Sequence, residues 1–130
     1  MIKAYTDIEQ SRKLTEILPL DSADCYWSYD NIQGFHRIEW FEDGYNKLSQ
    51  LGEKGIPCWS LAALFKVIPV VLDHANKKYR LRMDESEIDF DIWYEEMDMG
   101  LAQLDFDVIA PNMVDACVEM IVKLHSKELL

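Results

Sequence analysis

The sequence predicts an α+β fold, in which three helices pack on a small antiparallel sheet within one domain that spans residues 1–130. Near residues 79–94, apolar and charged residues alternate in two neighbouring runs, a pattern typical of a β-hairpin. The same alternation recurs near 103–108, and three other segments combine helix start signals with apolar faces. A chain of 130 residues that is 49% hydrophobic can bury a single core of this kind.

The first helix is expected near residues 6–18. Thr6 and Glu9 have the spacing of a capping box, in which two side chains satisfy free backbone amides of the first turn. Pro19 ends the helix, because it has no amide hydrogen and restricts the residue before it.

Residues 24–55 are rich in aromatic residues and glycine, and they indicate either two short strands or a long aromatic loop. The aromatic side chains offer either a ligand-binding surface or a cover for one end of the core, and they include Trp27, Phe35, Trp40 and Tyr45. The packing role is the favoured interpretation.

A second, short helix is expected near residues 59–68, which are apolar nearly all round. This pattern indicates burial on more than one side. Pro57 precedes the helix, as is common at helix starts, and Pro69 closes it.

The hairpin is expected to have strands near 79–83 and 88–94, joined by a loop at 84–87. In that register the cross-strand pairs are Tyr79–Ile92, Leu81–Phe90 and Met83–Ile88 on an apolar face, and Arg80–Asp91 and Arg82–Asp89 on a charged face. A slip of one residue would place each arginine opposite an apolar residue, so we expect the register to be readable from the sequence, with the apolar face inward and the charged face outward.

A third strand is expected near 103–108, where acidic and apolar residues alternate as they do in 88–94. Two acidic strands side by side would repel each other. We therefore expect Arg80 and Arg82 to lie on a strand between them, or the third strand to be offset.

The last helix is expected near residues 112–126. Asn112 is a favoured capping residue, and Asp115 lies in the first turn, where the helix dipole favours a negative charge. Apolar residues recur at spacings of three and four from Met113 to Leu124, which indicates a core-facing stripe.

The charge balance is strongly acidic, with 24 acidic against 13 basic residues and a net charge of −11. The electrostatic field of so acidic a chain repels phosphate backbones and anionic membranes, which disfavours direct nucleic-acid binding. The chain shows no signal sequence and no apolar run long enough to cross a bilayer, so we expect a cytoplasmic protein without membrane contact. The three cysteines form no CxxC pair, and the three histidines do not complete a zinc site, so we expect buried, reduced thiols and neither metal nor cofactor.

Cys58 lies near the expected start of the second helix, a position that can lower the pKa of a thiol and make it reactive. Its apolar neighbours Ile56, Pro57 and Trp59 favour instead an inert, buried thiol. No segment carries a recognisable catalytic or nucleotide-binding motif, so the sequence does not indicate an enzyme.

The candidate partner-binding residues lie on or beside the acidic strands, and they are Asp89, Asp91, Trp93, Glu95, Asp105 and Asp107. The acidic side chains among them allow three interpretations, namely a solvated face partly neutralised by arginines, a surface that binds a partner, or a site for a hard cation. The solvated face is the favoured interpretation and the partner-binding surface comes second. Side chains on adjacent strands lie roughly 5 Å apart, wider than ligands around one ion, and no EF-hand-like loop is present, so a metal site is not expected.

Three pieces of the chain resemble a group of small uncharacterised proteins found widely in gut Bacteroidetes genomes; they are residues 4–11 with 17–20, residues 58–64, and residues 115–121 with 123–125. Members of that group often look derived from phages or mobile elements. The group carries no assigned activity, so the resemblance transfers no catalytic residue. The layout is also distantly similar to the alpha-beta-alpha sandwich domain of small phage proteins, which supports the predicted fold.

These features together predict a non-enzymatic accessory protein of phage or mobile-element type that acts through contacts with an unknown protein partner. One alternative is an acidic mimic of nucleic acid that inhibits a DNA-handling or defence protein. Another is a small-molecule binder or small enzyme that uses the aromatic region at 26–45. The sequence does not specify an oligomeric state.

Overall fold

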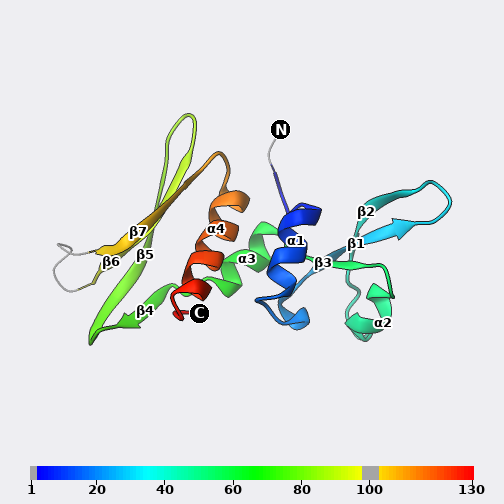
Figure 1. The fold of residues 1–130 in the computed structure, drawn as a ribbon, viewed down its shortest axis with the longest axis horizontal. Coiled ribbons are helices and arrows are strands. Elements are labelled where there is room, and N and C mark those ends of the chain that lie inside the picture. The colour runs from blue at the N-terminus through cyan, green and yellow to red at the C-terminus, as the bar shows by residue number, and fades with distance from the viewer. Residues whose placement is uncertain (1–2, 98–102) are drawn as a thin grey trace.

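The computed structural model describes residues 3–97 and 103–130, with the backbone alone for 103–106. In this part of the chain, three helices lie between two antiparallel sheets at opposite ends of an elongated molecule, and a short fourth helix lies beside one of the sheets (Figure 1). One sheet has three strands in the order β2-β1-β3, and the other has four in the order β4-β5-β6-β7. The α+β prediction is confirmed, although it placed one sheet where the structure has two.

The elements follow one another along the chain as α1 (Ile8–Thr15), the 3-10 turn η1 (Leu20–Ser22), β1 (Cys25–Asp30), β2 (Phe35–Trp40), α2 (Lys47–Leu51), β3 (Ile56–Cys58), α3 (Leu61–Val67), β4 (Val71–His74), β5 (Lys77–Glu85), β6 (Phe90–Glu96), β7 (Gln103–Ala110) and α4 (Met113–Ser126). The predicted helices correspond to α1, α3 and α4, and the predicted strands to β5, β6 and β7. The sequence did not predict α2, β3 or β4.

Helix α1 begins one residue later than its predicted capping box. Asp7, not Thr6, is the N-cap, because its carboxylate accepts from the backbone N–H of Gln10, whose side chain in turn accepts from the N–H of Asp7. Thr6 is instead fully buried, and its hydroxyl accepts from the backbone N–H of Trp59 at 3.1 Å. The residue that looked like a cap therefore serves to attach the first helix to the segment after β3.

The aromatic region forms two strands rather than a loop, as one of the two predictions proposed. β1 and β2 make a hairpin, and β1 pairs on its other side with the short strand β3. Helix α2 follows β2 and is capped by Asn46, whose side chain accepts from the N–H of Ser49. Gly52 ends that helix with a positive φ of 69°, a conformation that glycine adopts at little cost.

The predicted register of the 79–94 hairpin is wrong by four residues. Leu81 pairs with Tyr94 and Met83 with Ile92, so Arg80–Asp91 and Arg82–Asp89 are not cross-strand pairs. β5 extends to Glu85, and the turn comprises residues 86–89, where the hydroxyl of Ser86 donates to the carboxylate of Asp89 at 2.7 Å. A slip of four is even, so every side chain keeps its predicted face although its partner changes.

The third strand lies beside β6, and no arginine-bearing strand separates the two acidic strands. The expectation that Arg80 and Arg82 lie between the acidic strands is wrong, but the alternative, an offset third strand, is what the structure shows. Asp91 faces Ile109 and Asp107 faces Trp93, so these two aspartates are diagonal neighbours rather than direct ones, and the register shifts between Trp93 and Glu95. The offset reduces the repulsion that direct pairing would cause.

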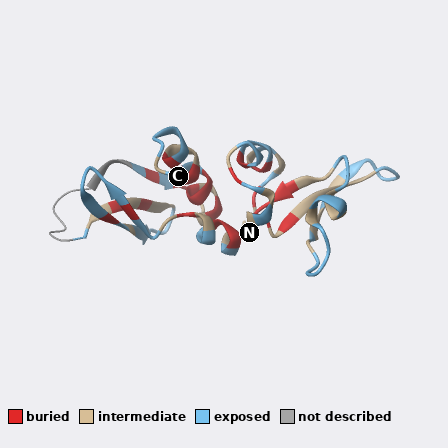
Figure 2. Ribbon diagram, turned by 90° about the horizontal axis from the view of Figure 1, so that it is seen from below, coloured by how far each residue is buried: buried red, intermediate tan, exposed pale blue. Residues whose placement is uncertain are grey.

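The core runs through the middle of the molecule, where buried residues follow the inward sides of the helices and sheets (Figure 2). Helix α4 contributes most of one side. Its predicted stripe is buried at Ala116, Cys117, Met120, Ile121 and Leu124 but only half-buried at Met113, and the stripe did not include Val114 and Val118, which are also buried. Trp59, immediately before α3, has no exposed surface, and its indole N–H donates to the hydroxyl of Ser22 at 2.9 Å. The core thereby reaches from the four-stranded sheet to the segment after β3.

Candidate functional site

The four-stranded sheet has one covered face and one open face. Helix α4 packs against β6 and β7 on the covered face, where Ile92, Tyr94 and Val108 are buried. The hydroxyl of Tyr94 donates to the carbonyl of Pro69 at 2.6 Å, so the polar end of this buried ring is satisfied. Because side chains alternate along a strand, the residues between these buried ones point to the opposite side of the sheet.

We define the open face by the side chains that point away from α4. The register arranges them in rows across the strands, with Val71, Arg80 and Glu95 in one row, Arg82, Trp93 and Asp107 in the next, and Asp84, Asp91 and Ile109 in the third. Each of these residues is exposed or half-buried. Trp93 therefore occupies the middle of the open face, with a cation on one side and a carboxylate on the other.

The third row concentrates negative charge. Asp84 and Asp91 lie directly opposite each other on β5 and β6, and Asp107 is a diagonal neighbour of Asp91. Partial burial raises the pKa of Asp91 above its usual range, and the charges of Asp107, Asp84 and Asp89 raise it further. Oδ1 of Asp91 is the one buried side-chain oxygen or nitrogen in the described residues that lacks a hydrogen-bond partner.

The positive charges of the open face lie toward its other end. Nε of Arg82 is 3.4 Å from Oε2 of Glu95, which sits diagonally across from it on β6. Arg80 is directly opposite Glu95. The arginines therefore balance Glu95 and leave the aspartates of the third row without a basic partner from β5.

The structure brings together four of the six residues that the sequence marked for partner binding. Asp91, Trp93, Glu95 and Asp107 share the open face. Asp89 lies in the turn before β6, where its backbone carbonyl accepts from the N–H of Ser86. Asp105 falls in β7, at a position whose side chain is outside the described residues.

On the open face, the sequence missed Val71, because it did not predict β4, and it also missed Asp84 and Ile109. Asp84 and Ile109 lie at alternating positions of strands that the sequence did predict, but Asp84 was assigned to the loop and Ile109 was placed beyond the third strand. The side chain of Ile109 is 58% exposed, and it adds an apolar patch beside Trp93.

The aromatic region at 26–45 does not gather its rings around one cavity. The indole N–H of Trp27 donates to the carbonyl of Thr6, and the rings of Tyr26 and Phe41 pack at a tilt of 34° with their centroids 4.7 Å apart. Trp40 and Tyr45 are largely exposed. An open hollow of about 490 Å³ lies near Tyr26, and it is lined otherwise by Glu42, Tyr45, Asn46, Ser49 and Gln50.

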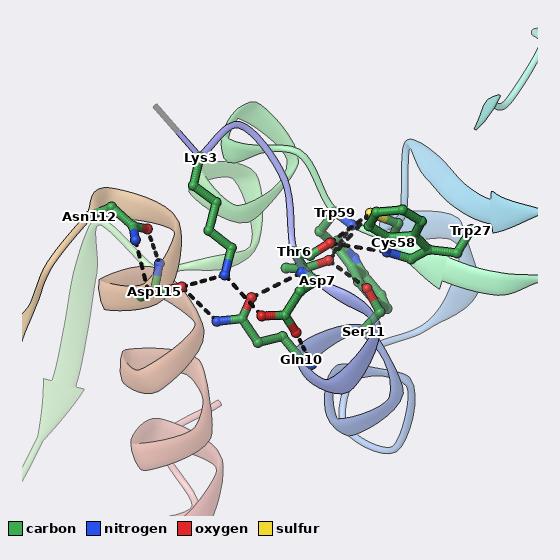
Figure 3. A network of polar contacts seen from close by, with 10 residues as sticks. All are labelled: Lys3, Thr6, Asp7, Gln10, Ser11, Trp27, Cys58, Trp59, Asn112 and Asp115. Carbon is green, nitrogen blue, oxygen red and sulfur yellow. Dashed lines mark hydrogen bonds and ion pairs between the residues drawn. The ribbon is translucent and has the colours of Figure 1, made fainter. Parts of the chain in front are cut away.

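A polar network ties the N-terminal segment to the rest of the fold (Figure 3). On one side, the ammonium of Lys3 and the side-chain amide of Gln10 both donate to Oδ1 of Asp115, at 2.7 and 2.8 Å, which joins α1 to the first turn of α4. Burial alone would raise the pKa of Asp115, but hydrogen bonds from Lys3, Gln10 and Asn112 outweigh it and lower that pKa.

The other side of the network is buried around Thr6. The hydroxyls of Thr6 and Ser11 are 2.7 Å apart, and the thiol of Cys58 donates to the carbonyl of Thr6 at 3.4 Å. Cys58 has no exposed surface, so the geometry favours the inert thiol over the reactive one. The segments that carry the resemblance, around Thr6, Cys58 and Asp115, are thus brought together by this network.

The described residues contain no group of three or more His, Cys, Asp or Glu side chains placed to hold a metal ion. Within residues 3–97 and 103–130, none of the helices has the length and apolar character that a bilayer crossing requires. No protein-family model, no curated protein and no solved structure matches the chain.

Proposed function

We propose that this chain is an accessory protein of phage or mobile-element type that acts by binding a protein partner through the open face of its four-stranded sheet. The phage setting rests on the resemblance of the three sequence segments. The observation that supports the binding role is the position of Trp93, half-buried at the centre of a face that α4 leaves open. Tryptophan combines a large apolar area with few rotatable bonds, which is why it is common at the centre of protein interfaces.

The surroundings of Trp93 fit an interface better than a purely solvated surface. Ile109 and Val71 add apolar area, while Arg82 and Glu95 supply polar groups beside Trp93. The neighbouring carboxylates of Asp84, Asp91 and Asp107 are a further reason, because a donor from a partner would offset their mutual repulsion. A lysine, an arginine or a backbone amide of the partner has the required chemistry.

The mixed charge of the open face argues against a mimic of nucleic acid. A phosphate mimic presents negative charge alone, whereas Arg80 and Arg82 occupy two of the three rows. A protein with charges of both signs is the better match.

The test is quantitative affinity capture from the native cells, comparing the wild-type chain with Trp93→Ala and Asp107→Lys. Each open-face variant has a matched control at the other end of the molecule. Tyr45→Ala, which removes an exposed aromatic ring, is the control for Trp93→Ala, and Glu53→Lys, which reverses an exposed charge, is the control for Asp107→Lys. We expect the wild type and both controls to capture the same partner, and both open-face variants to lose it by about tenfold or more.

Salt concentration separates the proposal from the mimic. A partner held around a buried tryptophan is retained at high salt, whereas a DNA-handling protein bound to phosphate-like charge is released. Equal capture by the open-face variants and their controls would contradict a binding role for this face.

A further inference from the structure

The outer edge of β2 differs from the other sheet edges of the described residues. β3 is only three residues long and contains Pro57, and the segment at residues 4–6 bonds to residues 59–61 just beyond it. β4 has four residues, and β7 is an acidic strand that would repel a copy of itself. β2 has six residues without proline, and it lies at the edge of its sheet (Figure 1).

The hydrogen bonds of the β1–β2 hairpin determine which groups of β2 point outward. The backbone N–H of Phe41 donates to the carbonyl of Asp24, in line with the strand register, so this is a hydrogen-bonded pair. Hydrogen-bonded and non-bonded pairs alternate along an antiparallel ladder. The N–H and C=O groups of His36, Ile38 and Trp40 therefore point away from β1, toward the open edge.

Apolar side chains flank the same edge. Phe35 is 49% exposed and Trp40 is 56% exposed, at the two ends of β2. Ile32, at the tip of the hairpin, is 96% exposed. An edge with free backbone groups and exposed aromatic residues favours the addition of another strand.

The side chains of β2 are self-complementary in one register. In a symmetric antiparallel pair, the twofold axis passes beside a single residue that faces its own copy. An axis at Arg37 places two arginines opposite each other, and an axis at Glu39 does the same for two glutamates. An axis at Ile38 instead places Arg37 opposite Glu39 of the second copy, twice, and Ile38 against Ile38.

We infer that β2 pairs with β2 of a second copy of this chain, antiparallel and centred on Ile38, so that two three-stranded sheets join into one of six strands. The outward backbone groups of Ile38 then bond to those of its counterpart, as the ladder of each hairpin requires. His36 faces Trp40 of the other copy, and Phe35 faces Phe41. Within one chain, Nε of Arg37 is already 3.3 Å from Oε1 of Glu39, so pairing builds a network of four charges.

The first test is sedimentation velocity of the full chain over a wide range of concentration, for which we expect a reversible dimer in the wild type. Ile38→Pro removes an outward N–H and leaves the bonds to β1 in place, so it should give a folded monomer. Arg37→Glu and Glu39→Arg each place like charges opposite one another, and each should weaken the dimer by several fold. The double variant restores opposite charges and should recover it.

The second test reads the register directly. Arg37→Cys in one preparation and Glu39→Cys in another place thiols opposite each other only in the mixed dimer, at a non-bonded pair where strands are closest. Under mild oxidation with a small disulfide reagent, which accepts the two electrons and the two thiol protons, the mixture should give a cross-linked dimer. Each variant alone should give little. The native cysteines are fully buried and are not expected to compete.

Each of three results would overturn the inference. They are a wild-type chain that stays monomeric at every concentration, a dimer that Ile38→Pro leaves unchanged, and equal cross-linking by the single variants and the mixture. Circular dichroism of every variant shows whether the fold is retained. If Ile38→Pro fails to fold, the charge-reversal series and its double variant still decide the question.

Discussion

Asp84 and Asp91 face each other directly across β5 and β6, so two like charges occupy one cross-strand pair of the four-stranded sheet. Asp107 adds a third carboxylate from β7 at the diagonal position. Such a pair lowers the stability of the isolated fold, because like charges directly opposite each other repel. This arrangement fits the proposed binding role, because basic groups of a partner would offset the repulsion between the carboxylates.

Replacing Asp91 by asparagine should stabilise the protein at neutral pH, by on the order of 0.5 kcal/mol. The folded-state pKa of Asp91 is raised, so its ionised form is disfavoured by folding. The cost is fully present above that raised pKa, and it disappears as the pH falls below the ordinary aspartate range. Urea unfolding across this pH range measures the effect, and an Asp91→Asn variant that is less stable at pH 7 would contradict it.

The observed hairpin register predicts a specific energetic coupling. Reversing Arg82 and Glu95 together should be milder than the sum of the two single reversals, by about 0.2–1 kcal/mol, because the pair is partly exposed. Arg82 and Asp89, which the sequence paired, should show no coupling in the same double-mutant cycle. Coupling to Asp89 without coupling to Glu95 would mean that the strands pair in the other register.

The link between α1 and α4 should weaken in acid. The folded-state pKa of Asp115 is lowered, so its contribution is present above the ordinary aspartate pKa and is lost as the pH falls through the folded one. Asp115→Ala should cost about 1–3 kcal/mol at neutral pH, since it removes acceptors from Lys3 and Gln10. The matched control is Glu119→Ala, an exposed acid on the same helix, which should cost far less. Chemical unfolding at neutral and acid pH measures both.

The three thiols should resist modification in the folded protein. Cys25, Cys58 and Cys117 have no exposed surface, which keeps reagents away from all three. Burial raises the pKa of Cys117 to about 12, so this thiol holds little thiolate at neutral pH. The hydrogen bond with Cys25 lowers the pKa of Cys58, so the resistance of Cys58 rests on its burial. A chromogenic disulfide reagent should react slowly in buffer and with all three cysteines in denaturant. Rapid reaction of one cysteine in buffer would show that its segment opens locally.

The alternation of side chains was enough to predict the faces of β5 and β6, but not their register. A slip of four residues leaves every face unchanged, and Arg82 finds an acidic partner in either register, at Asp89 or at Glu95. Two contributions favour the observed register over the predicted one. They are the hydrogen bond between Ser86 and Asp89 in the turn, and the packing of Tyr94 under α4. Neither contribution is visible in the pattern of polar and apolar residues alone.

The second sheet and the edge strand β4 were harder to predict for local reasons. A two-residue turn joins β4 to β5, and its residues Ala75 and Asn76 both have a positive φ, of 52° and 65°. That conformation is usually marked by Asn-Gly, so Ala-Asn gave no signal. β3 has only three residues and includes Pro57, which counts against a strand.

The candidate site was predicted in part, and its missing members show what the sequence lacked. Alternation placed Asp91, Trp93 and Glu95 on one face, and the structure agrees. Asp84 and Ile109 join them only through the pairing of three strands, which no local pattern specifies. A surface made of rows across a sheet depends on long-range register.

The placement of the two sheets at opposite ends of the helices has a consequence for binding strength. A pair of chains joined at β2 would carry its two open faces at the far ends of the assembly, related by the twofold axis. The dimer would then be bivalent. A partner with two binding sites within reach would then be held by avidity, with the second contact made at a high effective concentration. Even a weak contact at each Trp93 would suffice for stable capture of such a partner, whereas a target with a single site would be released quickly.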